Sequence, residues 1–334
     1  MIKIAIDAMG GDNAPDAIIR GTTKALKSNT DIEIYLYGKK DLIDKAIKNE
    51  NVSNDIINRI NIVNCMDVIG FDESPTVAIK TKKDSSIVVA CNDLKQGKVD
   101  VIVSAGSSGA LLVCGTLIVG RIKGIERPAF GIIVPSEMGN FLLVDCGANA
   151  DCKPNYINQF ALIGSVYYRE MFNKENPVVK LLNIGTEEEK GNLLIKEASD
   201  LLKQNTNINY NGYAESRDAI FGSCDVLVSD GFSGNIFLKT YEGTAKFILK
   251  NLKQVFKKNI FTILGYLLIK SNFKGLINKF DYKKHGGAPI LGLNKIIIKV
   301  HGNTDGDEIQ YAINQAQSFI QNNVNDRIIN NIKE

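Results

Sequence analysis

The sequence predicts a three-layer α/β/α protein built on a largely parallel sheet. Apolar runs of four to seven residues alternate with longer amphipathic stretches along the whole chain, which is typical of repeated βα units. Glycine-rich segments follow several of these runs, where the loops at the carboxyl ends of parallel strands are expected. The 334 residues are 44% hydrophobic and 23% charged, which suits a soluble protein with a sizeable core. We expect residues 1–334 to form a single α/β/α unit, whether or not it divides into two lobes.

The strands and helices follow in chain order from these patterns. Short apolar runs predict strands at Ile2–Asp7, Ile32–Tyr37, Ile60–Val63, Val99–Ser104, Phe130–Val134, Phe141–Asp145, Val179–Ile184, Val226–Ser229 and Ile296–Val300. Amphipathic stretches predict helices around Pro15–Ser28, Asp41–Asn49, Thr76–Gln96, Gly109–Arg121, Asn155–Met171, Glu187–Gln204 and Asp305–Asn322. No internal repeat or low-complexity linker interrupts this order, and the Asn-rich tail after Asn322 is expected to fray.

The six cysteines and two histidines exclude some classes of protein. No two cysteines form a C-x-x-C pair, and their spacing offers neither a zinc site nor a disulfide framework. The first residues read as a buried strand and lack the long apolar run of a signal peptide. We therefore expect a protein of the reducing cytoplasm.

Five glycine-containing loops follow predicted strands. They are Met9–Asp12, Ala105–Gly109, Cys146–Asn149, the loop at Gly185, and Asp230–Asn235. Because parallel strands end at one edge of a sheet, we expect these loops to converge on a common crevice. A glycine-rich turn that leads into a helix offers backbone N–H groups to an anion, although any single loop of this kind could equally be a tight turn.

Common nucleotide and hydrolase signatures are missing. The chain has no G-x-G-x-x-G after a strand, no G-x-x-x-x-G-K-[ST] and no G-x-S-x-G. A decarboxylating dehydrogenase of the same fold class is therefore disfavoured, and so is a catalytic triad. A lone histidine such as His301 is more often structural than catalytic.

The segment Asn183–Asn192 is unusual for its charge. Three glutamates after a strand suit the first turn of a helix, which would place Lys190 about one turn into that helix, just before a glycine. Two readings stay open: a solvated helix start, or a lysine aimed at an anion beside the strand edge.

Several motifs together resemble the bacterial acyl-ACP:phosphate acyltransferases, the PlsX family, over nearly the whole chain. The motifs are Ile6–Asp12, Ser104–Ala110, Asp145–Asn149, Leu182–Gly185 leading to Lys190–Asn192, Asp230–Asn235, Gly286–Pro289 and His301–Gly302. Two positions depart from the family pattern: Ser107-Ser108 stands where Asn-Thr is usual, and His285 stands where Tyr is usual.

The resemblance implies an isocitrate-dehydrogenase-like α/β/α fold and transfer of a fatty acyl chain from acyl carrier protein to inorganic phosphate. Phosphate is itself a nucleophile, so this chemistry needs an anion cradle and an oxyanion hole, and neither a cofactor nor a metal. Lys190 would hold the phosphate, while the Asn235 amide and the N–H groups of Ser233 and Gly234 would stabilise the oxyanion. The other substrate-binding residues that the resemblance implies are Asp7, Gly10, Gly11, Ser107, Ser108, Gly109, Asn149, Asn192 and His301.

The resemblance also implies partners and a location. The acyl phosphate would serve phospholipid synthesis through a downstream membrane glycerol-3-phosphate acyltransferase. The enzyme would be a homodimer, associated peripherally with the inner face of the cell membrane.

A basic segment is inserted within the catalytic unit at residues 243–284. From Lys246 to Lys284 there are ten lysines and one acidic residue, a net charge of +9, whereas the rest of the chain carries −6. Two amphipathic helices, Gly243–Lys257 and Asn259–Lys270, are expected to form a protruding hairpin, and its ten-residue apolar run is too short to span a bilayer. The hairpin could meet an anionic membrane surface, acidic acyl carrier protein or a second subunit. Nucleic acid is not expected, because aromatic residues are not interleaved with the lysines as stacking platforms.

Other functions compete with the acyl-ACP reaction. The donor could be acyl-CoA, as in a phosphotransacetylase. Alternatively, the protein could be a non-enzymatic membrane-surface scaffold that binds through its basic segment.

Overall fold

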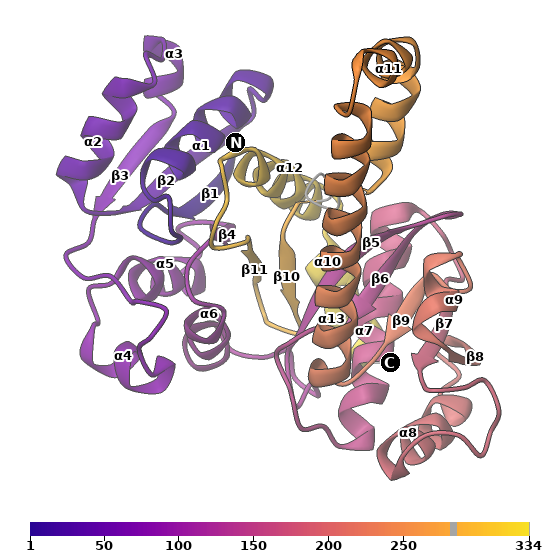
Figure 1. Cartoon of the computed structure of the whole chain (residues 1–334). Helices are drawn as coiled ribbons and strands as arrows, with labels where there is room; N and C mark the ends of the chain where they lie inside the picture. Colours follow the sequence, from indigo (N-terminus) through magenta and orange to yellow (C-terminus); the bar gives the residue numbers. More distant parts are fainter. Residues whose placement is uncertain (281–285, 334) are drawn as a thin grey trace.

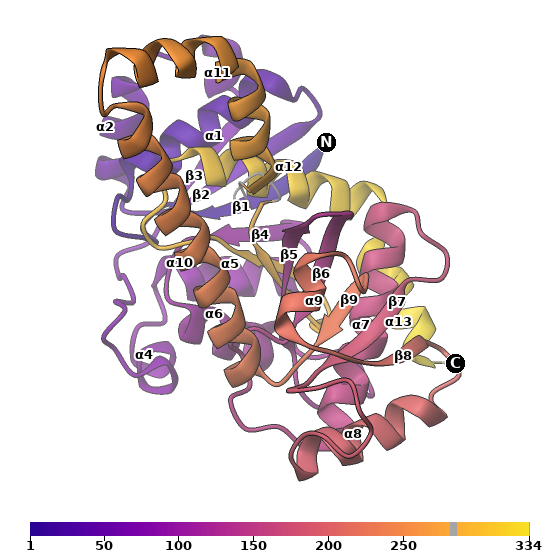
Figure 2. The same cartoon turned by 45° about the vertical axis from the view of Figure 1, so that its right-hand side comes forward.

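The computed structural model describes residues 1–280 and 286–333 and contains one mixed sheet flanked by helices (Figures 1 and 2). The strand order is β3-β2-β1-β4-β11-β10-β5-β6-β9-β7-β8. The end of the predicted basic segment, residues 281–284, and His285 lie outside the described residues.

The strands of the sheet are short and mostly buried. They are β1 (Ile2–Asp7), β2 (Ile32–Gly38), β3 (Ile60–Asn64), β4 (Val101–Ser104), β5 (Ala129–Ser136), β6 (Gly139–Val144), β7 (Val178–Leu182), β8 (Asn209–Ala214), β9 (Val226–Val228), β10 (Ala288–Leu291) and β11 (Ile296–Lys299).

The helices differ widely in length. They are α1 (Asp16–Ser28), α2 (Lys40–Asn49), α3 (Asn54–Ile57), α4 (Pro75–Thr81), α5 (Ser86–Lys95), α6 (Ser108–Cys114) with a π-helical turn at Gly115–Val119, α7 (Pro154–Phe172), α8 (Leu193–Gln204), α9 (Ser216–Ile220), α10 (Gly231–Phe256), α11 (Ile260–Phe280), α12 (Asp307–Gln321) and α13 (Val324–Lys333).

Two parallel halves of the sheet run in opposite directions. β3, β2, β1, β4 and β11 pair in parallel, and so do β6, β9, β7 and β8. Between the halves, β10 is antiparallel to β11 and to β5, and β5 is antiparallel to β6. The largely parallel sheet is as predicted, but the glycine-rich loops do not share one parallel edge.

The short strand β10 nevertheless brings the two sets of loops together. Its first residue, Ala288, pairs with Lys299 at the carboxyl end of β11, and its last residue, Leu291, pairs with Ala129 at the start of β5. The carboxyl end of β6 lies beside this start of β5, because Val144 pairs with Gly131. Four residues of strand span about 10 Å, so the carboxyl ends of β11 and β6 face each other across β10.

Helices cover both faces of the sheet, which completes the predicted three layers. One hydrophobic core lies between the sheet and α1, α2, α7, α8, α12 and α13. The other lies between the sheet and α4, α5, α6, α9 and α10.

Nine predicted strands are present with small shifts at their ends, whereas β8 and β10 were not predicted. The helix predicted at Thr76–Gln96 is two helices, because the chain turns between Thr81 and Ser86. The tail expected to fray forms α13, whose Val324 and Ile328 are buried in the first core.

The helix predicted to begin at Glu187 starts only at Leu193. Asn192 caps α8 by accepting a hydrogen bond from the Ile195 N–H at 3.0 Å, and Gly191 before it has a φ of +98°. Lys190 therefore lies in a loop outside the helix and not one turn into it.

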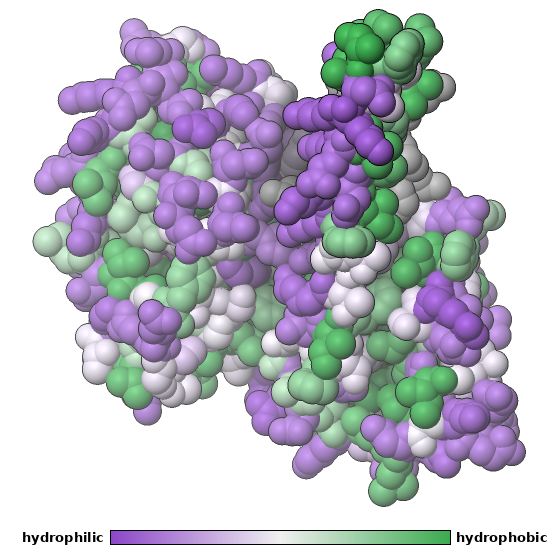
Figure 3. Space-filling model, viewed as in Figure 1, coloured by the Kyte–Doolittle hydropathy of each residue, from purple (hydrophilic) through white to green (hydrophobic). Residues whose placement is uncertain are grey.

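The predicted hairpin is present in the described residues, but its first helix is not a separate element. α10 begins beside the sheet at Gly231 and continues for 26 residues, about 39 Å. α11 turns away at its far end (Figures 1 and 2). Apolar side chains gather at this far end and hydrophilic ones along the flank of α10 (Figure 3). No helix within residues 1–280 and 286–333 is long and apolar enough to cross a membrane.

Two glycine substitutions test the helix packing. A Cβ added at Gly21 in α1 would overlap the Gly306 carbonyl oxygen, whereas one added at Gly243 in α10 would meet nothing within 4 Å. We expect Gly21→Ala to lower the free energy of unfolding by about 1–3 kcal/mol, and Gly243→Ala to raise it by up to about 1 kcal/mol through helix propensity. Denaturant titration of both variants measures this, and equal effects would contradict the packing described.

Candidate functional site

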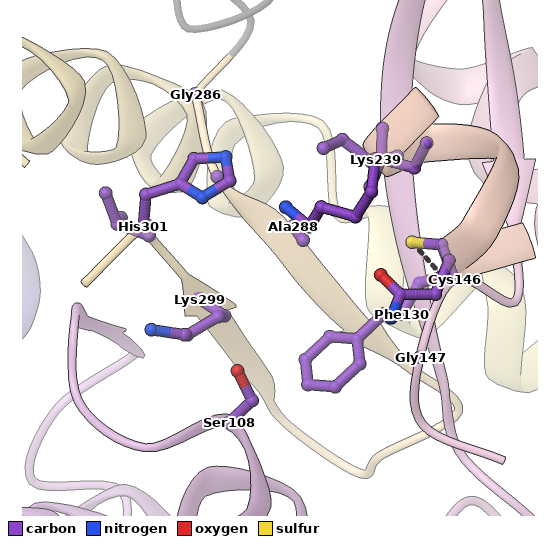
Figure 4. Close-up of a pocket in the computed structure, with 14 residues that line it drawn as sticks. Ser108, Phe130, Cys146, Gly147, Lys239, Gly286, Ala288, Lys299 and His301 are labelled. Atoms are coloured by element: carbon purple, nitrogen blue, oxygen red, sulfur yellow. Dashed lines mark hydrogen bonds between the residues drawn. The ribbon is translucent and has the colours of Figure 1, made fainter. Parts of the chain in front are cut away.

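A cavity of about 340 Å³ lies where the two halves of the sheet meet (Figure 4). Its walls come from the carboxyl ends of β4, β11 and β6, from β5 and β10, and from the first turns of α10. The lining residues are Ser108, Phe130, Ile132, Cys146, Gly147, Asn235, Leu238, Lys239, Gly286, Gly287, Ala288, Lys299, Val300 and His301.

Lys299 supplies a half-buried cation at the end of β11. Its Nζ donates a hydrogen bond to the Ala105 carbonyl at 3.0 Å. Burial lowers the pKa of Lys299 to about 8, although the carboxylates of Asp7, Asp12 and Glu308 act in the opposite direction. The ammonium form therefore predominates at neutral pH, and it is a form that an anion in the cavity would stabilise further.

A second cation, Lys239, enters the cavity from α10. Its Nζ lies 3.0 Å from Oε2 of Glu242, and the His301 Nε2 lies 3.5 Å from Oε1 of the same carboxylate. Burial opposes ionisation of Glu242, but the contacts with His301 and Lys239 outweigh it and hold its pKa below the usual range. In Figure 4 the side chains of Lys239 and His301 approach the cavity from opposite sides. Glu242 thus orients both.

Cys146 lines the cavity but lacks the character of a nucleophile. Its Sγ donates to the Phe130 carbonyl at 3.3 Å, and burial together with the nearby Asp145 raises its pKa well above the usual range. Since the thiolate is the reactive form, this thiol is neutral and inert. The cavity therefore suits direct attack by a bound nucleophile better than a covalent thioester intermediate.

The N–H groups expected from the start of α10 are already engaged. The Asp230 side chain caps the helix by accepting from the N–H groups of Phe232 and Ser233, at 3.0 and 2.8 Å, and the Gly234 N–H donates to the Asp230 carbonyl. The N–H groups of Ser233 and Gly234, for which an oxyanion role is predicted, therefore already have acceptors within the protein. The side-chain amide of Asn235, which lines the cavity, remains as a donor from this turn.

Asp7, Gly10 and Gly11 support the site from behind and do not line it. The Ser104 hydroxyl donates to Asp7 at 2.7 Å, which joins the ends of β4 and β1, and burial raises the pKa of Asp7. A Cβ at Gly10 would overlap this carboxylate. Gly11 has a φ of +104°, and a Cβ there would lie 2.8 Å from the Gly302 carbonyl oxygen. These close approaches hold the segment that carries His301.

Asn149 has a similar supporting role in the other half of the sheet. Its side-chain amide donates to the Pro128 carbonyl at 2.8 Å and to Asp145 at 3.0 Å. Asp145 also accepts from three backbone N–H groups, and burial, which outweighs these bonds, raises its pKa to about 6. Gly234 packs directly on the Asp145 carbonyl, so this network fixes the first turn of α10.

Of the thirteen predicted site residues, the cavity brings together Ser108, Asn235 and His301. Ser107 caps α6 by accepting from the Ala110 N–H at 3.4 Å, and Gly109 packs on Pro75. The remaining ones lie behind the cavity as described or on the other side of α10. Those on the other side are Asn192 and Ser233, which line a second cavity, and Lys190, an exposed residue of the same loop as Asn192.

Sequence reasoning missed both cavity lysines. Lys239 stands four residues after Asn235, which places the two on one face of a helix. Lys299 stands two residues before His301, which places the two on one face of an extended segment. The first spacing predicts that Lys239 lies beside Asn235, and the second predicts that Lys299 lies beside His301. Among the described residues no cluster of three potential metal ligands is present.

Two lysines, a histidine and a neutral amide converge on one cavity of an α/β/α protein. An enzyme that binds an anion and stabilises a developing oxyanion requires groups of these kinds.

Comparisons with known proteins identify the family. The family model described as "Fatty acid synthesis protein" matches residues 2–327. A phosphate acyltransferase of Clostridium botulinum (strain Alaska E43 / Type E3) is 49% identical over 98% of both chains. One of Caldicellulosiruptor bescii is 48% identical over 97% of this chain and 96% of its own. The chain belongs to the phosphate acyltransferase family (PlsX), as its motifs indicated, and is a phosphate acyltransferase.

Solved structures share the fold at low sequence identity. A phosphotransacetylase from Streptococcus pyogenes has a TM-score of 0.60 at 16% identity, covering 96% of this chain and 94% of its own. EutD phosphotransacetylase from Staphylococcus aureus has a TM-score of 0.61 at 15% identity, covering 95% and 94%. A putative 4-hydroxythreonine-4-phosphate dehydrogenase from Salmonella typhimurium has a TM-score of 0.50 at 12% identity, covering 95% and 99%. The predicted fold class, which also includes dehydrogenases, is confirmed.

The pKa of Lys299 predicts how phosphate use depends on pH. The ammonium is lost as the pH rises through about 8, so we expect the KM for phosphate to rise about tenfold per pH unit above that value. Lys299→Arg, whose guanidinium stays charged, should move the rise to higher pH. Steady-state kinetics at varied phosphate and pH test this. An identical profile for both proteins would exclude Lys299 from phosphate binding.

Proposed function

We propose that this protein transfers a fatty acyl chain from the thioester of acyl carrier protein to inorganic phosphate, and so makes acyl phosphate for phospholipid synthesis. The observation that carries the proposal is the convergence of Lys239, Lys299, His301 and Asn235 on one cavity of a phosphate acyltransferase. The volume of this cavity, about 340 Å³, can hold a phosphate and a thioester group but cannot also hold a long acyl chain.

Phosphate lies between the two lysines in this proposal. It carries one to two negative charges at neutral pH, which the ammonium groups of Lys239 and Lys299 offset. The Ser108 hydroxyl and His301 complete its ligands. Held in this way, one phosphate oxygen is oriented toward the thioester carbonyl carbon.

The attack forms a bond from that oxygen to the carbonyl carbon and places negative charge on the carbonyl oxygen. The Asn235 amide donates to this oxyanion, a contribution worth about 3–4 kcal/mol in other acyl-transfer enzymes. The carbon–sulfur bond then breaks, and the sulfur leaves with its electron pair. His301, held by Glu242 at 3.5 Å, is placed to give that thiolate a proton. The products are acyl phosphate and the free thiol.

The proposed role of Lys190 differs from the one that the sequence predicts. The sequence predicts that Lys190 holds the phosphate. However, the next two residues of its loop, Gly191 and Asn192, line the second cavity, on the other side of α10. We propose Lys239 and Lys299 for the phosphate, and for Lys190 a contact with the donor near the mouth of the second cavity.

The proposed partners are inferred from the charge and the exposed apolar side chains of the basic hairpin. A net charge of +9 from Lys246 to Lys284 favours acidic acyl carrier protein and anionic lipid headgroups. Apolar side chains near its far end are exposed, such as Phe261 at 80% and Leu268 at 87%. We propose peripheral attachment at the inner face of the cell membrane, near the acyltransferase that consumes the product, and assembly as a homodimer.

A phosphate-dependent cleavage assay tests the proposed function. The purified protein is incubated with palmitoyl-acyl carrier protein and phosphate, and acyl phosphate is detected by mass spectrometry. Palmitoyl-CoA and acetyl-CoA in parallel reactions compare donors. The acyl carrier protein donor is refuted if its thioester is used no faster than either CoA thioester.

Exchange of single lysines tests the assignment of the phosphate site. We expect Lys239→Met to raise the KM for phosphate more than about tenfold, because a charge-assisted contact is lost, whereas Lys190→Met should affect mainly the KM for the thioester. Initial rates at varied phosphate and varied donor separate the two effects. If Lys190→Met raises the KM for phosphate more than Lys239→Met does, the phosphate site lies at the loop of Lys190.

Changes at the far end of the hairpin test membrane attachment. Leu264 is 53% exposed and Leu268 is 87% exposed, and Leu264→Glu with Leu268→Glu puts negative charge where anionic lipid would lie. We expect flotation with anionic vesicles to fall severalfold and phosphate-dependent turnover to persist. Leu42→Glu, at a residue 45% exposed on α2, is the matched control. Unchanged flotation of the double variant would contradict the proposal.

A further inference from the structure

A second cavity, of about 840 Å³, runs along the opposite face of α10 from the first. Its volume is within the range of small-molecule binding sites. Its lining comes from the end of β7, the loop between β7 and α8, α8, α9 and one face of α10.

The helix separates the two cavities by its periodicity. Asn235, Leu238 and Lys239 face the first cavity, whereas Ser233, Thr240 and Thr244 face the second. At 3.6 residues per turn these sets lie on opposite faces of α10. The first cavity begins at Asn235 and the second includes Ser233, two residues earlier, so the two cavities lie nearest each other at the start of the helix.

The lining of the second cavity carries little charge. Apolar side chains such as Ile236, Phe237 and Ile248 share the α10 wall with the hydroxyl residues Ser233, Thr240 and Thr244. The charged lining residues are Asp230, which caps α10, and Arg217. From Ser233 to Ile248 the helix rises about 22 Å. This is a long groove with mainly apolar walls and two charged groups.

Large apolar side chains lie exposed along this groove. Ile184 is 80% exposed, Ile236 is 52% exposed and Ile248 is 51% exposed. Contiguous exposed apolar surface in a concave site favours an apolar ligand that would cover it. Mainly apolar walls with two charged groups, Asp230 and Arg217, favour a hydrocarbon chain as that ligand.

We infer that this groove holds the acyl chain of the thioester, with its carbonyl at the first turn of α10 and its methyl end toward Ile248. The inference rests on the proposed function, since it assigns a place to the chain that is transferred. It divides the substrate across α10: phosphate and the reacting carbonyl on the side of Lys239, the hydrocarbon on the side of Thr244.

A bulky residue partway along the groove tests this. Thr244 lies eleven residues after Ser233, about 17 Å along the helix, beyond the reach of an octanoyl chain but within the reach of a palmitoyl chain. We expect Thr244→Trp to lower kcat/KM for palmitoyl-acyl carrier protein by about tenfold or more, and to leave that for octanoyl-acyl carrier protein within about threefold of the parent protein.

Two control variants accompany it. Thr244→Val keeps the size of the side chain and should behave as the parent protein. Phe247→Trp makes a change on the same helix at a residue that is 68% exposed and does not line the groove, and should affect neither donor. Light scattering of each variant reports the oligomeric state.

The outcomes separate this inference from the proposed function. Equal loss with both donors, or no loss with either, overturns the groove as the acyl site. Equal loss together with a change of oligomeric state assigns the groove to a subunit interface instead. If the parent protein makes no acyl phosphate from either donor, the proposed function fails. Binding of the fluorescent fatty acid cis-parinaric acid then tests the groove: weakening by Thr244→Trp and not by Phe247→Trp supports it, and equal binding to all variants overturns it.

Discussion

The antiparallel pairing of the short strand β10 with both β11 and β5 is the constraint on which the site depends. Each half of the sheet is parallel within itself, and each ends its strands in glycine-rich loops, yet the halves run in opposite directions. A longer β10 would carry these loops apart, because every added residue separates the carboxyl ends of β11 and β6 by a further 3.3 Å or so. With four residues, Lys299 and His301 from one half meet the start of α10 from the other.

Once the loops have met, buried carboxylates hold them in place. Asp7 joins the ends of β1 and β4, Asp145 organises the loop after β6, and Glu242 orients Lys239 and His301. Each is satisfied by hydrogen bonds or by a cation, as a buried charge must be. Phosphate chemistry then needs few groups from the enzyme, since the substrate brings its own nucleophile. The protein contributes position, positive charge and an amide donor.

The sequence predicted the fold class, most strands and the family, because apolar periodicity and loop motifs are local properties. It missed β10, a four-residue strand that contains proline and follows two glycines, because its pairing is set by the tertiary structure. It also located the loops that carry Ser108, Asn235 and His301 to the cavity. Asp230 caps α10 with the N–H groups that were predicted to face the substrate, and an aspartate just before a helix is a capping signal that the motif alone does not take into account. The cavity lysines each stand near a predicted residue, yet their convergence on one cavity is a property of the packed sheet.

The length and continuity of α10 have a mechanical consequence. The helix is anchored where Gly234 packs on the Asp145 carbonyl and runs unbroken to Phe256, about 33 Å away. Asn235 and Lys239 lie within about 8 Å of this anchor along the axis. If the helix pivots as a rigid rod, the cavity moves at most about a quarter as far as the tip. A displacement of the hairpin tip would thus reach the reacting groups only in reduced form and leave them close to the spacing that acyl transfer requires.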